Sequence, residues 1–390
     1  MNSNEDSETK PIWPTPRTSL LELAALFVRL GVTAFGGPAV HIALMEEEVV
    51  ARRGWLTRQE FLDFLGATNL IPGPNSTEMA IHVGRVRRGL PGLLVSGVSF
   101  ILPAALIVGT LSWAYVKYGG LPQFAGVLYG VKPVVIAIIA QGAWRLAKTA
   151  VRTNWLGVLG AASVLAAGLG MDALLVLALA GAAAAARHAM VTGRSPKGVV
   201  SALFGWLPWV PKSASLGWIF LVMLKIGATI FGGGYVLVAF LRSDLVVRLH
   251  WLSEQQLLDA IAAGQVTPGP LFTTATFIGY LLGGTPGAVL ATFGIFLPAF
   301  VLVAASGPII PTLRRSAWAR DVLDAVNVAA LALMVVVSVQ LARSAIVDWK
   351  TAAIAAGFAL LLILYRLNTA WLILAAAVLG LLLRSPHLSP

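Results

Sequence analysis

Two cationic residues lie inside apolar stretches of this sequence, where an ionised group is costly. Arg29 falls within residues 20–30, and Lys225 falls within residues 219–230. A charge in such a place faces a polar cavity or reaches the membrane surface along its aliphatic stem. We interpret Arg29 and Lys225 as a cationic pair that faces an internal cavity, where their combined charge would suit a dianion.

Glycine and proline interrupt the apolar sequence at two kinds of motif. Pro72 and Pro74 each lack an amide donor and Gly73 is permissive, so a helix that arrives over residues 61–70 must end there. Residues 35–38 place two glycines directly before a proline that suits the first turn of a new helix. Both motifs therefore predict a helix break followed by a fresh helix start.

The titratable residues near these breaks are Glu78, His41 and His82. Asn75 is a preferred N-cap residue and Glu78 follows three residues later, which predicts a capping box. Glu78 and His82 share a helix face through their i, i+4 spacing, and all three titratable residues are candidates for carrying a coupled proton. We predict no metal site and no cofactor, because a single histidine in an apolar segment is usually packed and hydrogen-bonded and the chain has no cysteine.

Composition indicates that a membrane surrounds these motifs. Of the 390 residues, 58% are hydrophobic and 12% are charged, which is more apolar than an ordinary soluble domain. Runs such as residues 91–113, 124–144 and 287–309 approach or exceed the length of about 20 residues that a helix needs to cross a bilayer. Basic residues are scattered through short connections, so we attribute the net charge of +11 to membrane topology and expect no nucleic-acid partner. The sequence predicts an all-α polytopic membrane protein.

The chain also repeats itself. When Arg29 is laid on Lys225, residues 35–37 meet an identical FGG at 231–233, and the PGP at 72–74 meets the PGP at 268–270. We predict two homologous repeats, 19–190 and 213–384, joined by a linker over 191–212 and flanked by a polar cytoplasmic tail at 1–18 and a short tail at 385–390. In the first half the basic residues gather after the second and fourth apolar segments, whereas in the second half the densest basic cluster follows the third. Since basic residues mark the cytoplasmic side, this difference predicts inverted topology.

Four broken segments, two in each half, imply a polar cavity. Irregular backbone at membrane depth is tolerated where it lines a cavity or is covered by protein, and helix N-termini favour anions. Thr273 and Thr274 are expected to cap the second-half helix. We weight the first-half motifs more heavily, because the second half departs from them at Gly234 and Leu271. The predicted substrate-binding residues are Arg29, Lys225, Gly36, Gly37, Pro38, Pro72, Gly73, Pro74, Asn75, Ser76, Thr77, Gly232, Gly233, Gly234, Pro268, Gly269, Pro270, Thr273 and Thr274.

These motifs resemble a known family. The stretches FGGPAVHIALMEEEVV, RRGWL and NLIPGPNSTEMAIHVG, with FGGGY, WLSEQQLLD and VTPGPLFTTATFIG later in the chain, resemble the chromate transporter family in its long form with two fused homologous domains. The resemblance covers nearly the whole chain from Leu20 onward. It implies a multi-pass protein of the prokaryotic inner membrane that exports chromate by secondary active transport and gives chromate resistance.

The energetics of export agree with this expectation. Moving a dianion out of an inside-negative cell is favourable by about 4 to 5 kcal/mol per 100 mV, and proton antiport would add to that. The sequence holds no GxxxxGK[ST] phosphate loop.

Other functions stay open at this point. A transporter for sulfate or another oxyanion shares the shape and charge of the substrate, and sequence does not separate the two. An intramembrane enzyme using Glu78, His82 and His41 would belong to a different class, but no nucleophile pairs with a base in a recognisable motif, so we expect no enzyme. A homodimer is also left open.

Overall fold

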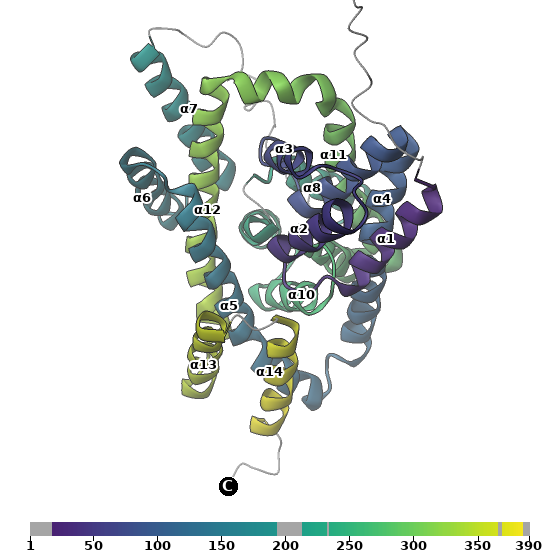
Figure 1. Cartoon of the computed structure of the whole chain (residues 1–390). Helices are drawn as coiled ribbons and strands as arrows, with labels where there is room; N and C mark the ends of the chain where they lie inside the picture. The colour runs from purple at the N-terminus through teal and green to yellow at the C-terminus, as the bar shows by residue number, and fades with distance from the viewer. Residues whose placement is uncertain (1–17, 193–212, 232–233, 366–368, 385–390) are drawn as a thin grey trace, which may run out of the picture.

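The structure is a computed structural model that describes residues 18–192, 213–231, 234–365 and 369–384 (Figure 1). Over these residues it is built from helices and holds no strand, which confirms the predicted all-α class. The predicted tails and linker lie outside the described residues, apart from Thr18 and the end of helix α7, which continues through Thr192.

The two halves present the same order of elements. The first half contains α1 (Leu20–Thr33), α2 (Pro38–Glu46), the π-helical η1 (Glu47–Arg52), α3 (Arg58–Thr68), α4 (Asn75–Tyr118), α5 (Pro122–Ala150), α6 (Asn154–Gly168) and α7 (Ala173–Thr192). The second contains α8 (Leu216–Thr229), η3 (Gly234–Val236), α9 (Leu237–Leu241), the π-helical η4 (Arg242–Arg248), α10 (Glu254–Val266), η5 (Leu271–Thr273), α11 (Thr274–Arg315), α12 (Ala317–Ala345), α13 (Trp349–Tyr365) and α14 (Thr369–Leu383). A π-helical turn thus follows the first break in each half.

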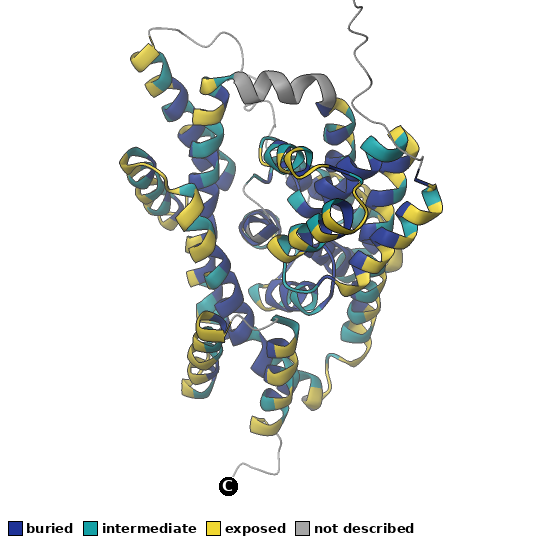
Figure 2. Ribbon diagram, in the orientation of Figure 1, coloured by how far each residue is buried: buried dark blue, intermediate teal, exposed yellow. Residues whose placement is uncertain are grey.

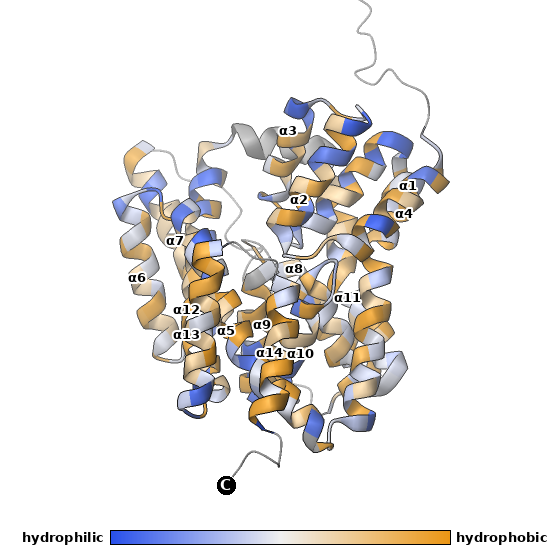
Figure 3. Cartoon of the chain, turned by 60° about the horizontal axis from the view of Figure 1, so that its bottom comes forward, coloured by the Kyte–Doolittle hydropathy of each residue, from blue (hydrophilic) through white to orange (hydrophobic). Residues whose placement is uncertain are grey.

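Several helices have the length and composition of membrane spans. Among the described residues, five stretches are long and apolar enough, over residues 75–118, 123–150, 173–192, 271–306 and 317–345, and four shorter apolar helices accompany them. The outer helices α6, α13 and α14 are hydrophobic along much of their length, with hydrophilic residues gathered near helix ends (Figure 3). They also expose one face, whereas the middle of α5 and α12 is buried (Figure 2). The chain is therefore a multi-pass membrane protein.

Helices α4 and α11 are each folded back into a hairpin. The turn lies at Arg88 and Gly89 in α4, where Gly89 has φ of 62°, and the corresponding Gly284 in α11 has φ of 61°. A Cβ on Gly84 would strike the carbonyl of Gly92, although residues eight apart in a straight helix are about 12 Å apart. Each hairpin therefore pairs a short arm, which starts at the PGP motif, with a long arm.

The two sequence halves are interleaved in space. Helices α6 and α7 of the first half pack against α12 of the second, while α13 and α14 of the second half pack against α5 of the first (Figure 1). Close helix contact is made through glycine: a Cβ on Gly130 of α5 would meet the backbone of Ala376 on α14, and one on Gly160 of α6 would meet Val328 on α12. The two sequence halves therefore do not form two separate bodies, and the bounds given to the repeats stay a prediction.

The four helix breaks meet at one place and are tied together across the halves. The amide of Gly73 donates to the carbonyl of Ile230 at 2.9 Å, and the amide of Gly269 donates to the carbonyl of Ala34 at 3.0 Å. The acceptors are the residues that end α8 and α1. We call this pair of reciprocal hydrogen bonds the crossing. It gives partners to backbone groups that a helix break would otherwise leave unsatisfied.

We expect Gly269→Ala to destabilise the protein by about 1 to 3 kcal/mol. Gly269 has φ of +89°, and its added Cβ would lie 2.8 Å from Cβ of Ala104 and 3.1 Å from the carbonyl oxygen of Gly31. Thermal unfolding of the purified protein in detergent measures the effect. The control is Gly357→Ala in α13, where open space surrounds the glycine and the change should be neutral or slightly stabilising. Equal stability of both variants would contradict a tightly packed crossing.

Candidate functional site

A cavity of about 500 Å³ lies beside the first-half breaks, between α5 and α12. Gly36, Pro38 and Asn75 line it from the first half, and Gly234 lines it from the second. Most of the rest of its wall comes from the last turns of α5 and the first turns of α12, and smaller parts come from α2, η3 and the residues just after α3 and α5. Because opposite ends of these two helices meet here, α5 and α12 run antiparallel. Two inverted repeats require this antiparallel arrangement. That the two halves enter the membrane in opposite orientations stays a prediction.

The lining of the cavity is strongly positive. Arg145 on α5, Arg152 just after α5, and Arg320 on α12 face a single carboxylate, Asp324, so three positive charges oppose one negative charge. The three arginines are exposed. Farther along α12, Asn327 adds an amide whose Oδ1 is buried without a hydrogen-bond partner. An arginine offers several N–H donors in a planar fork that suits oxyanions. The cavity therefore has the charge and the donors to hold a small oxyanion.

Two helix starts add to this character. Helix α2 begins at Pro38 after Gly37, and α4 begins at Asn75 after Pro74. No side chain caps either start, so first-turn amides keep their capacity to donate, and helix N-termini favour anions. Fresh helices thus begin at Pro38 and at Asn75.

The predicted capping groups are wrong. The N-cap of α4 is Pro74, and the side chain of Asn75 instead donates to Oδ1 of Asn69 at 2.8 Å. Both oxygens of Glu78 are buried and accept no hydrogen bond, because its carboxyl group lies against Gly73 instead of reaching back to an amide. In the second half, the hydroxyls of Thr273 and Thr274 donate to the carbonyls of residues 270 and 271 and accept nothing from the helix start.

Apart from Arg29 and Lys225, the predicted substrate-binding residues divide into three groups. Gly36, Pro38, Asn75 and Gly234 line the cavity, with Gly37 next to them. The residues that are mostly buried at the crossing or in the helix starts behind it are Pro72, Gly73, Pro74, Ser76, Thr77, Pro268, Gly269, Pro270, Thr273 and Thr274. Gly232 and Gly233 lie outside the described residues. Arg145, Arg152 and Arg320 were not predicted as site residues, since sequence shows them only as basic residues near helix ends.

Arg29 and Lys225 do not line the cavity. Arg29 pairs with Glu48 at 2.5 Å, and Lys225 pairs with Asp244 at 2.7 Å, so each cation on α1 or α8 binds a carboxylate on the π-helical turn that follows the break. Glu48 and Asp244 also correspond in the repeat, which is the signal that could have identified both pairs from sequence. Their predicted contact with substrate stays a prediction.

The three predicted proton carriers are buried, and two of them contact residues of the crossing. Nε2 of His41 lies 3.0 Å from the carbonyl oxygen of Ala34, the same oxygen that accepts from Gly269. His82 is buried and stacks on Phe64, with its Nε2 lacking a partner. Glu78 is fully buried. All three side chains are thus buried, and none of them lines the cavity.

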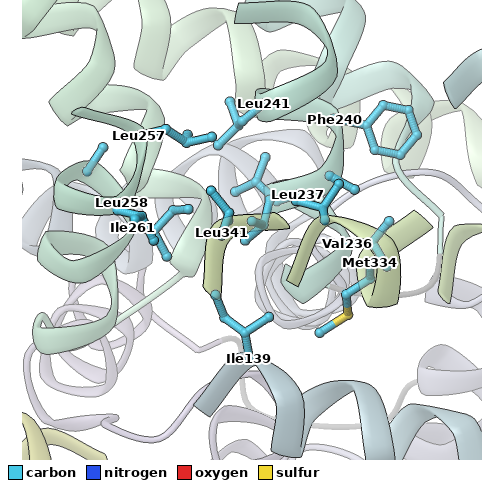
Figure 4. Packing of buried hydrophobic residues seen from close by; sticks show 14 of the residues in the cluster. Ile139, Val236, Leu237, Phe240, Leu241, Leu257, Leu258, Ile261, Met334 and Leu341 are labelled. Atoms are coloured by element: carbon cyan, nitrogen blue, oxygen red, sulfur yellow. The ribbon is translucent and has the colours of Figure 1, made fainter. Parts of the chain in front are cut away.

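The region of the second repeat's symmetry that corresponds to the cavity, at the other end of α5 and α12, is filled by side chains. Lys132 corresponds to the cavity residue Asn327, and it bridges α5 to α10 through Asp259 at 2.9 Å and Gln255 at 2.7 Å. The hydroxyl of Tyr115 also donates to Asp259 at 2.8 Å. Apolar side chains from α5, α9, α10 and α12 fill the adjoining space (Figure 4). We call the group Lys132, Asp259, Tyr115 and Gln255 the polar seal.

These features define a class: a multi-pass helical membrane protein built from a duplicated unit, with broken helices that meet beside a cationic cavity. A family profile described as "Chromate transporter" matches residues 21–186 and again 218–381. The chain belongs to the chromate transporter family.

Relatives of known name agree with this assignment. The chain is 33% identical to the chromate transport protein of Cupriavidus metallidurans, covering 98% of each chain. It is 33% identical to the probable chromate transport protein of Synechococcus elongatus, covering 86% of this chain and 88% of that one. An uncharacterized transporter of Methanocaldococcus jannaschii is 29% identical over 94% of each chain. No solved structure matches the chain.

We expect Lys225→Met to destabilise the protein by roughly 3 kcal/mol, because it leaves the buried carboxylate of Asp244 with only Arg248, at 3.7 Å. The double variant Lys225→Met, Asp244→Asn should recover most of that loss, because neither charge remains unpaired. Arg29→Met is the matched control and should cost less, since Arg29 is half exposed and Glu48 keeps Arg52 and Arg53.

Thermal unfolding and chromate binding, measured on the same samples, separate structural roles from binding roles. A Lys225→Met protein of normal stability that binds chromate weakly would assign Lys225 to the substrate and contradict a structural ion pair.

Proposed function

We propose that this chain is a secondary active transporter that exports chromate from the cytoplasm across the prokaryotic inner membrane. The observation that carries the proposal is the cavity in which Arg145, Arg152 and Arg320 face one carboxylate beside two uncapped helix starts. Relatives named chromate transport proteins support the choice of substrate. Outward movement of a dianion is favoured by the inside-negative potential, which supports export.

The asymmetry between the open cavity and the polar seal supports alternating access. One face of the α5–α12 pair has a cavity, while the related face is closed by the Lys132–Asp259 pair and packed apolar side chains. In the proposed cycle an anion enters the cavity, the seal opens as the cavity closes, and the anion leaves on the other side. Repeats that exchange conformations supply such a cycle without nucleotide hydrolysis.

Flux of labelled chromate into everted membrane vesicles tests the proposed function. Protein-dependent accumulation that collapses with the membrane potential is the expected result, and excess sulfate tests whether the cavity distinguishes two tetrahedral dianions. A folded protein that moves sulfate and no chromate would overturn the substrate and keep the transporter class.

We expect Arg145→Gln and Arg320→Gln each to raise the half-saturating chromate concentration about tenfold, which corresponds to about 1.4 kcal/mol. Each change removes one charged donor group from the cavity wall. The control is Arg343→Gln, which lies in the last turn of α12, at the other end of the helix from Arg320. Unchanged saturation in both cavity variants would place the anion elsewhere.

Cross-linking across the polar seal tests the proposed cycle. The chain has no native cysteine, so Lys132→Cys with Asp259→Cys gives one defined pair for a short, reducible bifunctional thiol reagent. We expect cross-linking to abolish chromate flux and reduction to restore the flux of the untreated double variant. Each single-cysteine variant, treated in the same way, is the control. Full flux through the cross-linked protein would show that the seal does not open.

A further inference from the structure

Glu78 is a buried acid that the proposed cycle does not yet use. Its side chain has no exposed surface, and neither carboxylate oxygen has a hydrogen-bond partner. Nearby on the same helix, the hydroxyl of Thr77 and Nε2 of His82 are also buried without partners. An ionised carboxylate held in this way is costly, whereas a bound proton removes the charge. The ligand that suits this group is therefore a proton.

In the described part of the chain, the elements packed around Glu78 place no cation against it. On α2, His41 is directed to the carbonyl of Ala34, and on α4 the guanidinium of Arg85 donates to the carbonyl of Val303. Helix α11 presents the methyl group of Ala299 near Gly73, and α3 presents Phe64 to His82.

The charged groups of the nearby first-half elements are engaged elsewhere. On α3, Glu60 accepts from the backbone of Thr57 and Asp63 accepts from Gln59, and on α1 Arg29 binds Glu48. Among the described residues, the structure shows no ion pair that involves Glu78.

The position of Glu78 links the substrate cavity to the crossing. Asn75, about one helical turn earlier on α4, lines the cavity. Gly73 packs directly on the carboxyl group, since a Cβ there would strike Oε1 of Glu78, and the amide of Gly73 makes one of the two hydrogen bonds of the crossing. A change of charge at Glu78 therefore acts both on an anion in the cavity and on the contact between the halves.

Only one half carries this group. The repeat places Thr274 where the first half has Glu78, and its hydroxyl donates to the carbonyl of Leu271. It also places Leu237 where the first half has His41. The acid is therefore not a structural requirement of the crossing, because the second half builds the same hydrogen bond without one.

We propose that Glu78 is a proton-binding site coupled to the anion, so that one proton is bound when the dianion occupies the cavity and the two move together. This inference rests on the proposed function. The physical reason is electrostatic: a negative charge about one turn behind the cavity wall repels a dianion, and protonation removes that repulsion. By linkage, the anion must then favour the protonated form of Glu78 to the same extent. The charge carried per anion falls from two to one.

Proteoliposomes that enclose a pH-sensitive dye test this coupling. Chromate is supplied outside at mildly alkaline pH, where it is fully dianionic, and a membrane potential drives it inward. We expect wild-type protein to acidify the lumen in step with entry of labelled chromate, and Glu78→Gln to move chromate without acidification. In binding assays, raising the pH should weaken chromate binding to wild type about tenfold and leave Glu78→Gln unaffected.

Controls separate this inference from the function on which it rests. Glu78→Thr, which copies the second half, is the companion variant if glutamine prevents folding, and His82→Gln should still acidify the lumen. Chromate entry into wild-type vesicles with a constant or rising lumenal pH would overturn the proton site while keeping the transporter. Acidification that persists in both Glu78 variants would also overturn it. Absence of chromate flux in folded wild type would instead overturn the proposed function.

Discussion

The structure depends on hydrogen bonds for the backbone amides and carbonyls that helix breaks leave unpaired inside the membrane. A helix that stops at membrane depth leaves amides and carbonyls without partners, and lipid supplies none. Here each half supplies what the other lacks: the carbonyls that end α1 and α8 accept from Gly269 and Gly73 of the opposite PGP loops. The glycines are required there because their φ angles are positive and their neighbours leave no room for a Cβ. The crossing therefore fixes the breaks, and the breaks supply the helix starts at the cavity.

Interleaving of the halves extends this constraint outward. Helices α6 and α7 pack on α12, whereas α13 and α14 pack on α5. Each outer helix pair therefore packs on the central helix of the other repeat. A tilt between α5 and α12 would consequently move helices from both halves at once. Cavity and polar seal lie at opposite ends of that same central pair, so in the proposed cycle a single rearrangement of α5 against α12 would widen one and close the other.

The sequence was sufficient to predict the features that depend on local residue chemistry, such as the helix breaks, and those that depend on the repeat, such as the equivalent cations. Pro72, Gly73 and Pro74 end a helix in any surroundings, so the breaks and the fresh helix starts were predictable. The capping box failed because the same local pattern is overruled by packing of Gly73 on Glu78. Arg29 and Lys225 were correctly matched as equivalent cations, but their partners Glu48 and Asp244 lie beyond a helix break. The cavity arginines were missed because the exchange of helices brings Arg145 and Arg320 together from distant parts of the chain.

The two halves share one order of helices but differ in side chains, and the differences include residues of the cavity, of the polar seal and at Glu78. Under the proposed alternating access, backbone equivalence would supply two conformations of comparable architecture. Side-chain differences then set their relative free energies: Lys132 forms an ion pair with Asp259 where its counterpart Asn327 lines open space, and Glu78 is an acid where Thr274 is a neutral hydroxyl. A fully symmetric duplicate would have no reason to rest with one side open. In the proposed cycle such differences would give the duplicated unit a preferred resting state, and a ligand would change that preference only by binding the two states unequally.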